Sequence, residues 1–195
     1  TDGRTFLWEV ETGKALQTLT DGGLSHAGAQ FVHGRAKRIV EVLDRDEVRL
    51  IDLETGSVED RFDIGHGEDA YAGALSEGGD FWVAATNTGR IYVKHRERAV
   101  RQAGALPYPV HSVVPLTGPL MLMAAAGTTG RLSVWDAASA QMLAEVAVHA
   151  DQIWDFDIGP DYRQLLTGGR DGAARLWSLA LETRSATEID ARIRC

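Results

Sequence analysis

The stretch GGRDGAARLW, residues Gly168–Trp177, decides how this chain is to be understood, because its pattern occurs more than once. GTTGRLSVWD spans Gly127–Asp136, and DGRTFLWE spans Asp2–Glu9. Each stretch is a small turn followed by a short run that contains a tryptophan at or next to its end. A turn that leads into a short run of this kind is typical of a β-hairpin. The repetition raises the question of whether the unit is a building block or a catalytic site.

The spacing of these units favours a building block. The final position of each turn-and-strand unit recurs at intervals of 43, 43, 41 and 42 residues. A fixed period of this length indicates a repeat architecture in which every repeat is one supersecondary unit. The positions compared are Trp8, Ile51, Lys94, Trp135 and Trp177.

One period contains four short strands. In the last repeat an alternating segment, Gln152–Gly159, is followed by a turn at Pro160–Tyr162 and an apolar strand at Arg163–Gly169. A tight turn at Arg170–Gly172 leads into the strand that ends at Trp177, and a weaker strand follows. Glycine, aspartate and proline at the turns support antiparallel hairpins. The turn between the third and fourth strands recurs as ETG or AASAQ, at Glu11–Gly13, Glu54–Gly56 and Ala137–Gln141.

Four antiparallel strands in each period resemble the WD-repeat β-propeller family, and the last repeat matches its pattern best. The family has a histidine before the first strand, a PDG-like turn, a Ser/Thr-Gly step, an aspartate in the second hairpin turn and Trp-Asp after the third strand. This chain has His149, the turn Gly159–Tyr162, Thr167-Gly168, Asp171 and Trp177-Ser178 at those positions.

The resemblance covers the whole chain unevenly. The fourth repeat ends in Trp135-Asp136 but has Leu106 in place of the histidine and Thr129 in place of the aspartate. The third repeat has Thr88 in place of the aspartate and Lys94 in place of the tryptophan. We therefore expect these repeats to depend more on apolar packing.

The resemblance implies an all-β fold, a β-propeller of four-stranded antiparallel blades. At this period the chain holds about 4.5 blades of an expected seven-bladed ring, so the missing blades are expected from the rest of a larger polypeptide. The expected units are a partial blade at 1–20, blades at 21–63, 64–106 and 107–148, a last blade at 149–184, and a C-terminal tail at 185–195 that could be helical.

Four side chains of the last repeat form an expected structural tetrad. The resemblance implies that Asp171 accepts a hydrogen bond from His149, that His149 contacts the Thr167 hydroxyl, and that this hydroxyl meets the Trp177 indole. A threonine, a histidine and an aspartate could also suggest a hydrolase. A nucleophile needs an open pocket and oxyanion donors, however, and the sequence shows neither. We therefore expect no catalytic residue and no enzymatic activity.

A partner-binding face is expected where loops join neighbouring blades. Function on a rigid scaffold of this type lies in its loops, and aromatic residues with arginine suit a protein interface. Trp154 could instead fill packing space, since Ile153 and Phe156 flank it. The face comprises Gln152, Trp154 and Arg170 of the last repeat, Asp69, Tyr71 and Asn87 of the third, and Tyr108, His111 and Thr128 of the fourth.

Composition narrows the other possibilities. The net charge is −8, which argues against nucleic acid as a partner because phosphate binding needs a basic face. No apolar run reaches the length of a membrane span. Cys195 is the one cysteine, which fits a cytoplasmic protein without disulfides. The six histidines are scattered, so no metal site is expected, and no motif indicates a cofactor.

The sequence thus predicts a non-catalytic scaffold or sensor propeller that presents its loops to a protein partner. The alternative is an autoregulatory C-terminal domain that controls an upstream effector enzyme, because the tail Ser185–Cys195 resembles the endings of bacterial multidomain proteins. In those proteins a propeller follows a kinase, a protease or a nucleotide-switch ATPase that acts in signalling or defence.

Overall fold

The structure is a computed structural model that describes residues 4–19, 26–32, 35–43, 47–65, 67–95, 98–116 and 122–179. The regular structure in these residues consists of seventeen β-strands in five separate antiparallel sheets. No helix in the described part of the chain is long and apolar enough to cross a membrane. The helix considered for 185–195 lies outside the described residues.

Three of the sheets have four strands in chain order. The first contains β3 (His26–Val32), β4 (Arg35–Leu43), β5 (Glu47–Asp52) and β6 (Val58–Asp63). The second contains β7 (Ala70–Leu75), β8 (Phe81–Thr86), β9 (Arg90–His95) and β10 (Arg101–Ala105). The third contains β11 (Val110–Pro115), β12 (Leu122–Gly127), β13 (Arg131–Asp136) and β14 (Gln141–Ala147).

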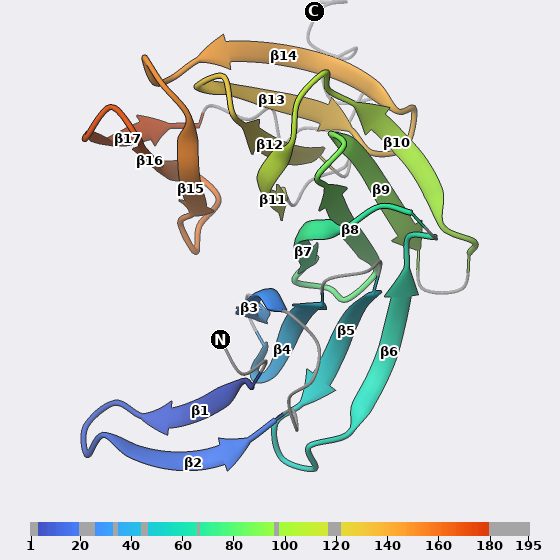
Figure 1. The fold of residues 1–195 in the computed structure, drawn as a ribbon, viewed down its shortest axis with the longest axis vertical. Helices are drawn as coiled ribbons and strands as arrows, with labels where there is room; N and C mark the ends of the chain where they lie inside the picture. Colours follow the sequence, from blue (N-terminus) through green and yellow to red (C-terminus); the bar gives the residue numbers. More distant parts are fainter. Residues whose placement is uncertain are drawn as a thin grey trace, which may run out of the picture.

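Two smaller sheets flank these three along the chain. The N-terminal sheet pairs β1 (Phe6–Glu9) with β2 (Lys14–Thr18), and the C-terminal sheet joins β15 (Ile153–Ile158), β16 (Gln164–Gly169) and β17 (Ala174–Ser178). The prediction of an all-β chain with four-stranded antiparallel units is confirmed. The described strands form an open arc and do not close a ring (Figure 1).

The turns follow from residues that tolerate a positive φ angle. Gly13 and Gly56 end the two ETG turns with φ angles of 66° and 68°, and Ala140 takes the same conformation in the third turn, with a φ angle of 62°. Aspartate side chains close the second and third of these turns, because Asp52 Oδ1 accepts the backbone N–H of Thr55 and Asp136 Oδ1 accepts that of Ala138. Asp136, the last residue of the RLSVWD strand, therefore stabilises the turn of its own hairpin.

The apolar core lies between neighbouring sheets. Phe62 and Trp82 belong to the cluster between the first and second four-stranded sheets. Ile91 and Trp135 belong to the cluster between the second and third, and Ile153 belongs to the cluster next to the C-terminal sheet. The four-stranded sheets and the C-terminal sheet thus bury apolar side chains against one another, which is the main source of stability for such short strands.

The first strand of each sheet with three or four strands lies on the inner side of the arc. Figure 1 shows β3, β7, β11 and β15 on this concave side and β6, β10 and β14 on the outside. Two hydrogen bonds connect neighbouring inner strands: Gln30 Nε2 donates to Gly73 O at 2.7 Å, and Ser112 Oγ donates to Asp155 Oδ1 at 2.9 Å. The concave side is therefore one continuous surface built from sequence-distant repeats.

Candidate functional site

The four expected tetrad side chains form one hydrogen-bonded chain in the C-terminal sheet. His149 Nδ1 lies 2.9 Å from Asp171 Oδ1, and His149 Nε2 lies 2.8 Å from Thr167 Oγ1. Trp177 Nε1 donates to Thr167 Oγ1 at 3.0 Å. Because the carboxylate can only accept, His149 Nδ1 is the donor in its bond to Asp171.

Burial decides what this chain of hydrogen bonds can do. Thr167 is 0% exposed, so its hydroxyl is out of reach of a substrate. The His149 side chain is also 0% exposed, and its two ring nitrogens both have partners. A fully satisfied buried network holds strands in one geometry. The arrangement therefore resembles a hydrolase triad only in its residue types.

The Asp171 carboxylate is the charged end of the network. The hydrogen bond from His149 holds the pKa of Asp171 well below its usual range, against the opposing effect of burial. Arg175 adds a hydrogen bond at 2.8 Å, and the backbone N–H groups of Ala150 and Ala173 donate as well. The carboxylate thus ties the turn before β17 to the segment before β15.

Sheets without the full tetrad use other contacts at the same positions. Trp135 Nε1 donates to Ser133 Oγ at 2.9 Å within its own strand. Lys94, at the position of the missing tryptophan, contacts Asp60 Oδ1 of the preceding sheet at 3.0 Å. Thr86 and Thr88 share a hydrogen bond of 2.9 Å beside the position of the missing aspartate. These two sheets therefore use polar contacts that differ from those of the tetrad.

Three residues of the expected partner-binding face occupy the same structural position in successive sheets. Tyr71, His111 and Trp154 each sit where the pairing register shifts, after the first residue of β7, β11 and β15. A residue in such a β-bulge has no partner on the next strand, and the bulge changes the direction of its side chain. The three rings accordingly come from the innermost strand of three neighbouring sheets.

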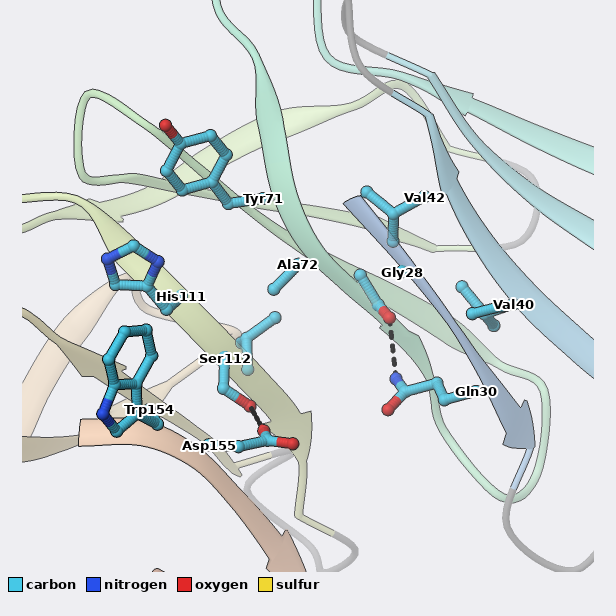
Figure 2. Close-up of a pocket in the computed structure, with 13 residues that line it drawn as sticks. Gly28, Gln30, Val40, Val42, Tyr71, Ala72, His111, Ser112, Trp154 and Asp155 are labelled. Atoms are coloured by element: carbon cyan, nitrogen blue, oxygen red, sulfur yellow. Dashed lines mark hydrogen bonds between the residues drawn. The ribbon is translucent and has the colours of Figure 1, made fainter. Parts of the chain in front are cut away.

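These rings lie together at the edge of a groove of about 300 Å³ on the concave side (Figure 2). Tyr71 and His111 stack with ring centroids 5.4 Å apart and an interplanar angle of 23°. Trp154 is 61% exposed, so it does not fill packing space within the described residues. Burial lowers the pKa of His111, which favours its neutral ring.

The other expected face residues do not line this groove and make their contacts elsewhere. Asn87 Nδ2 donates to Asp69 Oδ2 at 2.9 Å, directly before β7. Arg170 N donates to Gln152 O at 2.7 Å, which joins the turn after β16 to the start of β15.

Two residues of the fourth repeat complete the set. Tyr108 turns toward the outer strand, where its hydroxyl donates to Glu145 of β14 at 3.1 Å. Thr128 is half-buried in the turn after β12. The structure therefore brings Tyr71, His111 and Trp154 to one groove and leaves the remaining face residues out of its lining.

Sequence reasoning missed the polar residues of the groove itself. Ser112 and Asp155 line it and are bonded to each other, and Gln30 lines it from β3. Ser112 and Asp155 each follow a bulged ring directly in the sequence, so the repeat period could have pointed to them. In the described residues no three histidine, cysteine, aspartate or glutamate side chains gather as metal ligands.

Comparison with known proteins finds similarity over part of the chain. No protein-family model matches the chain. WD repeat-containing protein 3 of Mus musculus is 38% identical over 55 residues, which is 28% of this chain and 6% of that protein. WD repeat-containing protein 3 of Homo sapiens is 34% identical over 53 residues, which is 27% of this chain and 6% of that protein. The matches thus span a small part of the length of these relatives.

Proposed function

We propose that this chain is a WD-repeat domain and a non-catalytic module that binds a protein partner through the groove on its concave side; the partial matches to WD repeat-containing protein 3 support this. WD-repeat domains are generally protein-interaction scaffolds and are typically non-catalytic. The observation that carries the proposal is the exposure of Trp154 beside the stacked Tyr71 and His111 rings.

Exposed aromatic rings at a concave surface support a binding role for a physical reason. A tryptophan exposed to water loses the benefit of burying a large apolar surface, and a partner that covers it regains that free energy. Aromatic residues and arginine also dominate the energetics of protein interfaces. Arg170 is near enough to contribute, because its backbone N–H bonds to Gln152 two residues before Trp154.

The proposal is tested by affinity capture with the immobilised domain from an extract of its native cells. We expect Trp154→Ala combined with Arg170→Ala to lose at least one protein that the unmodified domain captures. The matched control is Trp8→Ala combined with Arg163→Ala, since Trp8 is 55% exposed and Arg163 is also exposed. Identical captured proteins for both double variants would reject the groove as the binding surface.

An autoregulatory role in a larger signalling protein stays a prediction from the sequence. The contacts within the described residues support a rigid surface for a partner, which either role could use. The scaffold role is proposed because it needs only the groove and the rings that line it.

A further inference from the structure

The three rings of the groove have polar atoms that the described residues leave unused. In the described part of the chain, no hydrogen-bond partner contacts the Tyr71 hydroxyl, either ring nitrogen of His111, or Trp154 Nε1. By contrast, Trp82, Trp135 and Trp177 each donate their indole N–H to a partner. The core rings thus have their N–H groups bonded internally, whereas the polar atoms of the groove rings are left for a guest.

The formal charge of the groove lining is negative. Asp155 is the one formally charged side chain among the described residues that line it, and no lysine or arginine lines it. Asp155 Oδ1 accepts hydrogen bonds from Ser112 Oγ and from the Phe156 backbone N–H, while Oδ2 has no donor within the described residues. The carboxylate is therefore held in place with one oxygen open to a guest (Figure 2).

These features exclude some guests and favour another. An anionic guest would meet a carboxylate and the negative faces of aromatic rings, and no lysine or arginine among the lining residues would compensate. A purely apolar guest would displace water from Asp155 and leave a desolvated charge without a partner. A cationic guest suits both the rings and the carboxylate, since it is attracted to ring faces and can pair with the open oxygen of Asp155.

We propose that Tyr71, His111, Trp154 and Asp155 form a binding site for one lysine or arginine side chain that a partner protein presents on an extended segment. This inference rests on the proposed function and names the chemistry of the partner. A volume of about 300 Å³ is at the lower limit for ligand sites, which suits one long side chain with its neighbouring backbone. The net charge of −8 supports the approach of a basic segment.

Small residues line the groove next to the rings, which leaves room for the partner's side chain to enter between the rings and the carboxylate. Ala72 and Gly73 line the groove beside Tyr71, and Gly28 lines it from β3. A Cβ atom built at Gly73 would lie 2.8 Å from Val48 Cγ1, so the backbone packs closely on the neighbouring sheet at this position. The groove thus has a firm wall at this point.

The test is an NMR titration of the whole chain, with the indole N–H signal of Trp154 as the reporter. The probes are short capped peptides of glycine and serine with one central arginine, lysine, citrulline or glutamate. Citrulline has nearly the shape of arginine without its charge. We expect the arginine and lysine peptides to shift the Trp154 signal and to bind about tenfold more tightly than the citrulline peptide, as for loss of a partly desolvated cation–π contact.

Variants separate the proposed contacts. Asp155→Asn and Tyr71→Ala should each weaken binding of the arginine peptide by about tenfold, whereas Tyr71→Phe, which keeps the ring, should retain it. Asp161→Asn, an exposed turn residue outside the groove lining, serves as the charge control. Each variant is compared by its melting temperature, so that a loss of fold is recognised.

Two results would overturn the inference. If the citrulline peptide binds as tightly as the arginine peptide, the groove accepts polypeptide but does not select a cation, and the proposed function survives without this chemistry. If no peptide shifts the Trp154 signal, or only the glutamate peptide does, the cation site is wrong. The capture experiment then decides separately whether a whole protein uses this surface.

Discussion

At the scale of single residues, Thr167 shows how one hydroxyl connects two sequence motifs. It accepts from the indole of half-buried Trp177 and bonds to Nε2 of buried His149, so its removal takes one partner from each of these nitrogens. The sequence pattern suggested these neighbours because the last repeat matches the family pattern. The same pattern could not predict that Trp135 bonds to Ser133, because that contact depends on a rotamer chosen by local packing.

Thr167→Val tests the network without changing the volume of the core. We expect the free energy of unfolding to fall by about 1–3 kcal/mol, because buried donors and acceptors lose their partner while apolar packing is kept. Chemical denaturation measures the change. Thr18→Val on exposed β2 is the control and should have little effect. Equal stability of the two variants would show that the hydroxyl has no structural role.

The Asp171 carboxylate predicts a dependence of stability on pH. Its pKa in the folded protein is below the ordinary value, chiefly because His149 donates to it. A lowered folded pKa stabilises the protein above the unfolded pKa of about 3.9, and this contribution is lost as the pH falls through that value toward the folded pKa.

Asp171→Asn should therefore melt at a lower temperature than the unmodified chain at pH 7, and the difference should shrink below about pH 4. Thermal melts at a series of pH values measure this difference. Asp161→Asn controls for the loss of one exposed carboxylate in the same sheet. A difference that stays constant down to strongly acid pH would contradict the assignment.

At the scale of elements, tight turns and bulges position both the hairpins and the groove. Gly89 and Gly130 occupy the same turn in successive sheets and have φ angles of 87° and 69°. A Cβ atom at Gly89 would lie 2.2 Å from the Leu106 carbonyl oxygen, and one at Gly130 would lie 2.4 Å from that of His149. These glycines let the segment that leads to the next sheet pass close to the turn.

Gly89→Ala should destabilise the chain more than Gly172→Ala. Both positions have a positive φ angle, which costs about 1–2 kcal/mol for a residue with a Cβ atom. Gly172 occupies the corresponding turn of the C-terminal sheet and has no atom within 4 Å of an added Cβ atom, so only Gly89 adds a backbone clash. Denaturation midpoints compare the two variants. Equal losses would show that the close approach is not a constraint.

The bulges at Tyr71, His111 and Trp154 belong to the same scale. The sequence placed these residues near strand starts, where loops join neighbouring repeats. It did not show the register shift that turns each side chain out of its ladder, because a bulge is a matter of pairing between two strands. The shared groove follows from the bulge recurring in three sheets.

At the scale of the whole molecule, the described sheets pack in chain order around a concave side. Each apolar cluster joins two neighbouring sheets, so a sheet depends on the sheets beside it for its stability. The bond from Ser112 to Asp155 crosses such a boundary at the inner strands. The number of blades in the ring and the expected blade boundaries stay predictions, since the described strands form an arc.

The 41–43 residue period, the turn residues and the alternating apolar positions were enough to infer short antiparallel strands grouped in sheets of four. They were enough because hydrogen bonding within a hairpin is local and depends on residues close in the chain. Tertiary structure alone made a site of Tyr71, His111, Trp154 and Asp155. These residues come from three repeats, and only the packing of one sheet on the next, together with a bulge in each inner strand, brings their side chains to one groove.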